Sequence, residues 1–284
     1  MSAQRGTLDG KVIIITGGGT GLGRSMALCL AAEGADIVVA ARRVQPLEET
    51  AAGVRKLGGK ALVIPTDVTD TAQCNNLIAK SLAEMGKIDV LINNAGIVRG
   101  EQRVPLWDIT DEAWRTGIEV NLSGGFYCSR AVSKYFADKR EGKIILVASG
   151  EGFRGQRDSY MYNTAKAGVV NLTRVMALSL AEYNIRVNCI VPGFVDTFEN
   201  QPEEYQKAVA QARAAGAMAG ARRLFVPIGH SGKPDDIGNV ALFLCSDASD
   251  YITAGIFISD GGGLAGGFAT TGYAPLVSLK EGLA

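Results

Sequence analysis

Three side chains suited to proton transfer lie close together in the segment SGEGFRGQRDSYMYNTAK: the hydroxyl of Ser149, the phenol of Tyr162 and the ammonium of Lys166. The apolar spacing from Tyr160 onward predicts a helix, and side chains four residues apart share one helix face. Tyr162 and Lys166 should therefore be neighbours, whereas Tyr160 misses that face. A neighbouring ammonium lowers the pKa of a phenol, ordinarily roughly 10, toward neutrality. The pair is suited to general acid–base catalysis, although a bare Tyr-x-x-x-Lys also fits an interfacial aromatic and a solvated lysine.

A second motif, TGGGTGLG, runs from Thr16 to Gly23 between an expected strand and an expected helix. Unpaired N–H groups and the dipole at a helix N-terminus favour phosphate, and glycines let a pyrophosphate approach the backbone. This setting favours a dinucleotide site over ordinary tight-turn glycines. Two more residues precede the middle glycine, Gly21, than in the plain dinucleotide fingerprint.

The elements that position these motifs alternate along the chain. Strands alternating with helices of this length indicate βαβ units and a parallel sheet covered on both faces. No linker or repeat divides the chain, so we predict one domain over residues 1–284, with an α/β fold built on a doubly wound, seven-stranded parallel sheet. The expected strands are KVIIIT, DIVVAAR, KALVIPTDV, IDVLINNAG, GKIILVAS, IRVNCIVPG and GIFISD.

Composition narrows the function classes. The 284 residues carry 29 basic and 29 acidic side chains without a basic block, which argues against nucleic acid or an anionic membrane surface as partner. No apolar run reaches membrane-spanning length and the N-terminus lacks the apolar core of a signal peptide, so a cytoplasmic protein is expected. Five scattered cysteines suggest reduced core residues, and a single histidine leaves no zinc site.

Taken together, these motifs resemble the short-chain dehydrogenase/reductase family. TGGGTGLG is similar to the family's Thr-Gly-x-x-x-Gly-x-Gly turn, and NNAG at 93–96 is similar to the motif after its fourth strand. Ser149 has the family's spacing from Tyr162, thirteen residues, and PGFVDT at 192–197 and DGG at 260–262 match its later motifs. The resemblance spans about residues 10–262 and implies a Rossmann fold.

The resemblance implies four catalytic residues. Tyr162 would exchange a proton with the substrate oxygen, while Lys166 would lower the phenol pKa and hold the nicotinamide ribose. Ser149 would orient the carbonyl and stabilise its developing charge. Asn121 would hold a water that relays protons through Lys166; its alternative role is that of a structural asparagine in a capped or kinked helix.

The resemblance also implies the cofactor contacts. Asp67 would contact the adenine amino group, with a simple helix cap as its alternative role, and Thr197 would bind the nicotinamide carboxamide. The full expected set is Gly17, Thr20, Gly21, Leu22, Gly23, Arg42, Arg43, Asp67, Val68, Asn94, Ala95, Gly96, Tyr162, Lys166, Pro192, Gly193, Val195 and Thr197.

The end of the second expected strand predicts which nicotinamide cofactor is used. Members that prefer NAD usually carry an acidic residue there, but here Ala41 holds the place and Asp36 is expected to precede the strand. Arg42 and Arg43 follow, and a guanidinium offers the 2′-phosphate a charge-assisted contact. NADP(H) is therefore predicted over NAD(H), which remains the alternative; the arginines would otherwise cap the next helix or lie in solvent.

The substrate stays open beyond a carbonyl or secondary alcohol. Charges in loops 99–103 and 151–158 fit either an anionic substrate or internal ion pairs in solvated loops. A 3-oxoacyl-thioester reductase is the alternative within the class. A non-catalytic dinucleotide sensor or scaffold is the alternative outside it, against which the four intact catalytic residues argue. The charged residues are Arg99, Glu101, Arg103, Glu151, Arg154, Arg157 and Asp158.

The resemblance further implies assembly and two variable segments. Family members are mostly tetramers, so a homotetramer is expected, with a dimer as the alternative. Residues about 198–230 would form a lid that excludes water from the substrate. The extension 263–284 is too apolar to leave wholly solvated and should pack on a neighbouring subunit.

Overall fold

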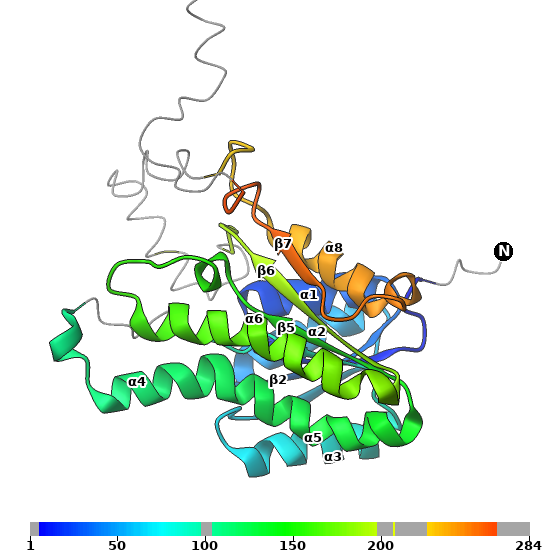
Figure 1. Cartoon of the computed structure of the whole chain (residues 1–284). Helices are drawn as coiled ribbons and strands as arrows, with labels where there is room; N and C mark the ends of the chain where they lie inside the picture. Colours follow the sequence, from blue (N-terminus) through cyan, green and yellow to red (C-terminus); the bar gives the residue numbers. More distant parts are fainter. Residues whose placement is uncertain (1–5, 98–103, 198–206, 208–225, 266–284) are drawn as a thin grey trace, which may run out of the picture.

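The computed structural model describes residues 6–97, 104–197, 207 and 226–265. At its centre is a parallel sheet of seven strands, as the sequence predicts (Figure 1). The strand order is β3-β2-β1-β4-β5-β6-β7. Every neighbouring pair runs parallel. The strands are β1 Val12–Thr16, β2 Asp36–Ala41, β3 Ala61–Pro65, β4 Val90–Asn93, β5 Gly142–Val147, β6 Ile185–Pro192 and β7 Ile256–Ser259.

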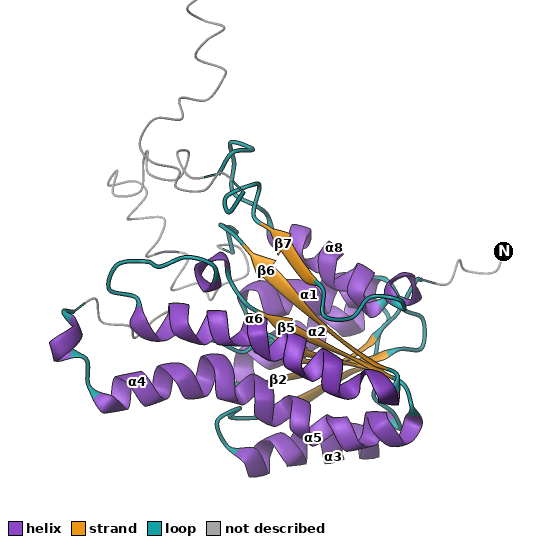
Figure 2. Cartoon of the chain, viewed as in Figure 1, coloured by secondary structure: helices purple, strands orange, loops and turns teal. Residues whose placement is uncertain are grey.

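Helices cover both faces of the sheet (Figure 2). Side chains of β1 alternate between two cores: Ile14 packs toward α3, α5 and α6, whereas Ile13 and Ile15 pack toward α1, α2 and α8. This is why β1 is buried throughout and apolar from Val12 to Ile15. No helix of the described ranges has the length and apolar character needed to cross a membrane. The helices are α1 Gly21–Ala32, α2 Val44–Lys56, α3 Thr71–Met85, α4 Asp111–Ile118, α5 Gly124–Lys139, α6 Tyr160–Leu180 and α8 Pro234–Cys245.

The start of α3 shows that Asp67 is not the cap of this helix. The residue that caps this helix is Asp70, whose carboxylate accepts hydrogen bonds from the N–H groups of Ala72 at 2.8 Å and Gln73 at 3.2 Å. Asp67 instead closes a local turn by accepting from the backbone and hydroxyl of Thr69 at 3.0 and 2.8 Å. A helix cap is therefore the wrong structural role for Asp67.

Several element boundaries differ from the sequence prediction. Helix α1 begins at Gly21 within the glycine motif, because the packing of its first turn overrides the low helix propensity of glycine. The sequence pattern from Asp111 to about Asp138 is helical, and the structure interrupts this helix with a π-helical turn at Glu119–Ser123. Asp36 is the first residue of β2 rather than a residue before it, and its carboxylate accepts from the N–H of Lys60. The segment 199–220, whose polar sequence also favours a helix, lies outside the described residues apart from residue 207.

The strand order reverses between β1 and β4. From β1 the chain builds outward through β2 and β3, then returns to place β4 on the other side of β1. At such a reversal the loops after neighbouring strands diverge, and ligands of open α/β sheets bind in the resulting crevice at the carboxyl ends. The fold therefore directs attention to the segments that follow β1, β2, β3 and β4.

Candidate active site

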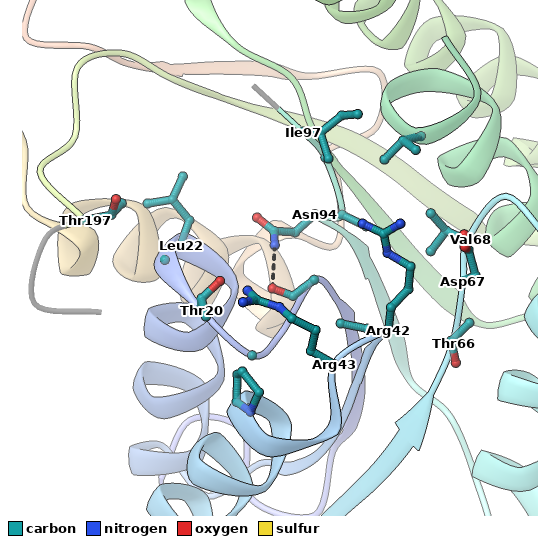
Figure 3. A pocket seen from close by; sticks show the side chains of 18 residues that line it. Thr20, Leu22, Arg42, Arg43, Thr66, Asp67, Val68, Asn94, Ile97 and Thr197 are labelled. Atoms are coloured by element: carbon teal, nitrogen blue, oxygen red, sulfur yellow. Dashed lines mark hydrogen bonds between the residues drawn. The ribbon is translucent and has the colours of Figure 1, made fainter. Parts of the chain in front are cut away.

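A cavity of about 420 Å³ opens at this strand reversal (Figure 3). It is lined by segments that follow all four strands, and most of the residues expected to contact the cofactor take part. Those residues are Gly17, Thr20, Gly21, Leu22, Arg42, Arg43, Asp67, Val68, Asn94, Ala95, Gly96 and Thr197. The remaining ones, Gly23, Tyr162, Lys166, Pro192, Gly193 and Val195, do not line it.

Six further residues line the cavity. Thr66, Ile97 and Val120 each adjoin a motif residue, so their position in the sequence is a usable signal. Ala41 marks the end of β2. Pro46 has no sequence signal: it lines the cavity because Gly19 packs on it, and a Cβ on Gly19 would come within 3.1 Å of its side chain. Gly19 is the sixth.

The glycine turn is tied to the NNAG segment by Thr16. Its buried hydroxyl oxygen accepts hydrogen bonds from the N–H groups of Asn94 and Ala95, each at 3.1 Å. In return, the Asn94 side-chain amide donates to the carbonyl oxygens of Thr16 and Gly17 at 3.1 and 3.2 Å. These four bonds hold two walls of the cavity together, a role for Thr16 that sequence reasoning missed.

The geometry of the glycine turn fits a pyrophosphate. Gly17 and Gly21 have φ values of +67° and +55°, which favour glycine. Thr20 stands at the N-cap of α1 without a side-chain capping bond, so the first N–H groups of this helix lack that partner at the cavity. Orphan N–H groups at the positive end of a helix dipole bind phosphate. A dinucleotide is therefore compatible with the residues present.

Arg42 and Arg43 extend into the cavity from the end of β2 (Figure 3). Both are exposed, and neither guanidinium forms a hydrogen bond or ion pair within the part of the chain that the structure describes. Arg43 occupies the position before α2 but makes no capping bond with its side chain. Capping is thus not its role, and both guanidinium groups face the cavity with their donors available.

Tyr162 and Lys166 lie on one face of α6, as their spacing predicts. The Lys166 Nζ is 5.6 Å from the centroid of the Tyr162 ring and donates to the carbonyl oxygen of Val147 at 2.9 Å. Lys166 is only 4% exposed. This burial lowers the pKa of its ammonium from 10.5 to about 8, while the nearby thiol of Cys189 opposes the shift.

Ser149 follows β5 in a short loop that is docked on α6. Its hydroxyl oxygen accepts from the N–H of Glu151 at 3.2 Å. Gly152 packs directly on the helix backbone, since a Cβ there would come within 2.7 Å of the Lys166 carbonyl oxygen. The close packing fixes Ser149 beside the helix that carries Tyr162 and Lys166. We call residues 149–153 the serine loop.

Asn121 lies in the π-helical turn and is buried. Both polar groups of its side chain are hydrogen-bonded: the oxygen accepts from the N–H of Ile97 at 2.9 Å, and the amide donates to the carbonyl oxygens of Ile97 and Gly117 at 3.1 and 3.0 Å. The structure thus shows the structural role considered for this side chain. Gly96 lies between the two groups, because a Cβ on it would be 2.9 Å from the Asn121 oxygen and 3.4 Å from the Lys166 Nζ.

The charged loop 151–158 contains internal ion pairs. Arg154 donates to Glu151 at 2.8 Å, and Arg157 lies 3.4 Å from Asp158. Of the two alternatives for this loop, the structure therefore shows internal ion pairs. Loop 99–103, nearly all of the expected lid and the extension beyond residue 265 lie outside the described residues.

Three expected cofactor residues serve other contacts. Gly193 packs against Asp260, whose Cβ would be 2.4 Å from a Cβ on this glycine. Val195 forms a bridge with Gly232, and Pro192 ends β6 as a buried residue. These contacts hold the loop after β6 in place, while Thr197 at its end reaches the cavity.

Comparison with known proteins identifies the family. The family model described as short chain dehydrogenase matches residues 11–208. The chain is 35% identical to the 3-oxoacyl-[acyl-carrier-protein] reductase of Thermotoga maritima, over 90% of this chain and 98% of that protein. The chain belongs to the short-chain dehydrogenases/reductases.

Other short-chain dehydrogenases/reductases are equally similar. A Mycobacterium tuberculosis reductase of a hydroxy-methyl-oxo-hexahydroindene-carboxyl-CoA is 37% identical over 88% of this chain and 92% of that protein. The structure of 7α-hydroxysteroid dehydrogenase with NADH and 7-oxo glycochenodeoxycholic acid has a TM-score of 0.79 and 32% identity, covering 93% of this chain and 98% of that one. The protein is thus an oxidoreductase of a family that acts on CH–OH and C=O groups with nicotinamide dinucleotides.

Gly23→Ala should disrupt the cavity of this dehydrogenase/reductase. A Cβ at this position would lie 2.2 Å from the carbonyl oxygen of Gly17 and 2.6 Å from the Asn94 amide nitrogen, so backbone must move. We expect a loss of about 1–3 kcal/mol in the free energy of unfolding and weaker dinucleotide binding. Thermal or urea unfolding and a cofactor titration measure both.

Gly125→Ala is the matched control for that substitution. Gly125 is also in the first turn of a helix, α5, but its Cβ would meet nothing closer than 3.7 Å. Removing a helical glycine there should leave stability unchanged or raise it by roughly 0.5–1 kcal/mol. Equal behaviour of the two variants would show that the close approach at Gly23 is not what shapes the cavity.

Proposed function

We propose that the protein is an NADP(H)-dependent oxidoreductase that interconverts a carbonyl compound and a secondary alcohol, with Tyr162 as general acid and base. The observation that carries this proposal is the placement of a buried ammonium, Lys166, beside the Tyr162 ring on α6. The serine loop packs on the same helix, and Gly96, which lines the candidate dinucleotide cavity, lies next to the Lys166 ammonium.

Each residue has a distinct task in this proposal. When bound, the nicotinamide supplies or accepts the hydride. Tyr162 gives its proton to the carbonyl oxygen during reduction and takes it back during oxidation. Ser149 donates a hydrogen bond to the same oxygen and stabilises its developing negative charge. The Lys166 ammonium favours the phenolate over the phenol and binds the ribose hydroxyls of the cofactor.

Asn121 contributes to proton exchange with solvent through its backbone and not through its side chain. Both functional groups of its side chain already bond to Ile97 and Gly117. We therefore assign the relay water to the backbone of the π-helical turn rather than to the side-chain amide. Turns of this kind frequently mark functional sites. The side chain instead orients the segment after NNAG beside Lys166.

A panel of carbonyl compounds and secondary alcohols, followed by nicotinamide absorbance, tests the proposed activity. The panel should include cyclic ketones, short diketones, aldehydes and 3-oxoacyl thioesters, each with NADPH and NADH. Turnover of at least one carbonyl compound supports the proposal. A complete lack of turnover, with the dinucleotide still bound, would favour the non-catalytic sensor or scaffold instead.

Arg42→Ala should remove most of a preference for NADPH. The unmodified protein is expected to prefer NADPH by about tenfold or more, since a hydrogen bond to a charged group contributes about 1.5–3 kcal/mol. The substitution should raise KM for NADPH and leave KM for NADH nearly unchanged. Equal use of both cofactors by the unmodified protein would contradict a phosphate contact at Arg42. NAD(H) is the alternative, and the structural relative solved with NADH is an example of a neighbour that binds this cofactor.

A 3-oxoacyl-thioester reductase is the second candidate. It is supported by the 35% identity to the reductase of Thermotoga maritima, which acts on a 3-oxoacyl chain bound to acyl-carrier protein. The thioester members of the carbonyl panel separate the two candidates. A kcat/KM for acetoacetyl thioester well above that for every free ketone would favour this second function.

We further propose one cytoplasmic domain over residues 1–284 that assembles as a homotetramer, without nucleic acid or membrane as partner. Exposed apolar side chains on three elements, α6 for one interface and α8 with β7 for the other, support assembly through two interfaces. Val175 and Leu178 lie on α6, whereas Ile258 lies on β7 and Phe243 on α8. Residues 198–230 would act as a substrate lid and 263–284 as an intersubunit extension. The mass in solution of the full chain measures the assembly.

A further inference from the structure

The turn after β7 is held rigidly by one carboxylate. Asp260 accepts hydrogen bonds from the N–H of Gly262 at 2.8 Å and from the N–H of Leu264 at 2.6 Å. Its own carbonyl oxygen accepts from Gly263 at 3.3 Å. Gly261 and Gly262 have φ values of +63° and +87°, so this tight path needs glycine. We call residues 260–265 the C-terminal turn.

The C-terminal turn is anchored on the loops that frame the active site. Gly193, directly after β6, packs against Asp260 with no room for a side chain. On the other side, the N–H of Ile228 donates to the carbonyl oxygen of Gly261 at 3.1 Å, and the Val226 side chain packs against the same glycine. The turn therefore has a fixed position relative to the carboxyl ends of β6 and β7.

This anchoring places Leu264 next to the serine loop. Three atoms of its side chain lie 3.8–3.9 Å from the position of a Cβ on Gly150, the residue after Ser149. Leu264 is partly buried and packs against the core under α6. A side chain from the end of the described chain thus reaches the catalytic loop, although 115 positions separate residues 149 and 264 in the sequence.

The segments that meet at the C-terminal turn carry exposed apolar side chains, and the Asp260 carboxylate beside Leu264 is engaged by the N–H groups of Gly262 and Leu264. Each segment that meets here carries a half-exposed apolar side chain: Phe153 in the serine loop, Phe194 in the loop after β6, and Ile228 beside the C-terminal turn. The nearest charges of the serine loop neutralise each other, because Arg154 is paired with Glu151. Apolar surface of this kind gains free energy when an apolar ligand removes it from water.

We propose that Leu264 is a specificity-determining residue that contacts the non-reacting part of the substrate, and that this part is an apolar ring or chain. The inference rests on the proposed carbonyl reductase activity, because it takes Ser149 to mark the reacting oxygen. Asp260 is then a positioning residue, since it acts only by seating Leu264 over the serine loop. The alternative is that Leu264 does no more than fill the core beside Gly150.

Leu264→Ala tests the proposal with two ketones of different size. With 2-decalone, which presents a fused apolar ring system, we expect kcat/KM to fall about tenfold or more, mainly through KM, because a pocket loses contact with several methylene groups. With butane-2,3-dione, which is too small to reach Leu264, kcat/KM should change less than about twofold. The Kd for NADPH should stay unchanged.

Two further variants control this experiment. Leu57→Ala removes a half-exposed leucine at the end of α2 and should alter neither ketone. Leu264→Phe adds volume instead of removing it, so it should also change the ratio of the two kcat/KM values. This variant tests the contact if Leu264→Ala does not fold. Equal losses for both ketones, or no loss, would show that Leu264 only fills the core.

Direct binding separates this inference from the proposed function. If the unmodified protein reduces no compound of the carbonyl panel, the proposed activity fails, and the Kd of 2-decalone in the presence of NADPH decides the inference alone; the same Kd decides it if only these two ketones are not reduced. Calorimetry or ligand-observed NMR should show binding that Leu264→Ala weakens about tenfold. An identical Kd for both proteins, or no binding to the unmodified protein, would overturn the role of Leu264.

Discussion

Tyr162→Phe should abolish turnover while leaving cofactor binding nearly intact. In the proposed mechanism the Tyr162 hydroxyl exchanges a proton with the substrate oxygen, and the substitution removes this hydroxyl but retains the ring that packs beside Lys166. A positioned acid or base contributes roughly 10²–10⁴-fold to a rate, so kcat should fall at least about 100-fold. Nicotinamide absorbance with the best ketone of the panel measures kcat, and fluorescence titration measures the Kd for NADPH.

Tyr160→Phe is the matched control for this prediction. Tyr160 is the first residue of the same helix, two positions earlier, so its side chain leaves the helix in a different direction from that of Tyr162. Removing its hydroxyl should leave kcat within about twofold of the unmodified protein. A Tyr162→Phe enzyme with substantial residual turnover, or a Tyr160→Phe enzyme that is equally impaired, would assign the proton to another donor.

Patterns that depend on neighbouring residues were predictable from the sequence. The strands follow from short β-branched runs, and the Tyr162–Lys166 adjacency follows from helical periodicity alone. The seven-stranded parallel sheet follows from the alternation of the two patterns. Glycines at strand ends located the cavity at the strand reversal, because the physical requirement for a close backbone approach is itself local.

Contacts between distant segments were not predictable from the sequence. Pro46 lines the cavity only because α2 packs against the glycine turn, and nothing near it in the sequence signals this. Similarly, the carbonyl oxygen that binds Lys166 belongs to Val147 on another element, and Leu264 reaches Gly150 across most of the second half of the chain. The bonds from the Asn121 side chain to Ile97 and Gly117 likewise depend on tertiary packing that the sequence does not signal.

Lys166→Met should remove catalysis and weaken cofactor binding without lowering stability. Loss of the ammonium removes both the charge beside Tyr162 and the donor to the ribose. We expect kcat to fall about 100-fold or more. The Kd for NADPH should rise about tenfold or more, since a hydrogen bond from a charged group contributes about 1.5–3 kcal/mol. An unchanged Kd would contradict the ribose contact.

The stability part of this prediction follows from burial. A Lys166 pKa of about 8 against the ordinary 10.5 means that burying the charged form costs about 3 kcal/mol at pH 7. Methionine has a similar length and no charge, so the substitution removes this cost. It also removes the hydrogen bond to the Val147 carbonyl oxygen, and an unsatisfied buried group costs roughly 1–3 kcal/mol. The two effects nearly cancel or favour the variant, and Tm at pH 7 should be unchanged or raised.

The pH dependence of stability isolates the contribution of the buried charge. Below pH 8 both the folded and the unfolded protein bind the Lys166 proton, so the unmodified protein bears the full cost of burial. Between pH 8 and 10.5 the folded protein releases the proton while the unfolded chain keeps it, so folding of the unmodified protein becomes more favourable relative to Lys166→Met. The difference in unfolding free energy between the two proteins should therefore shift toward the unmodified protein as pH rises from 7 to 10.

Lys143→Met is the contrasting control. Lys143 is the other buried lysine of the described residues, and unlike Lys166 it forms an ion pair. Its Nζ lies 2.8 Å from an Asp250 carboxylate oxygen and donates to Ser249 at 3.1 Å. Replacing it leaves these partners without their cation, and breaking a buried pair costs about 3–5 kcal/mol at full burial and less where one partner is exposed. Lys143→Met should therefore lower Tm and leave catalysis intact, since Lys143 lies on β5 at the end away from Ser149. A clear loss of stability in Lys166→Met at pH 7, comparable to that of Lys143→Met, would show that the catalytic ammonium is stabilised by its surroundings rather than held there at a cost.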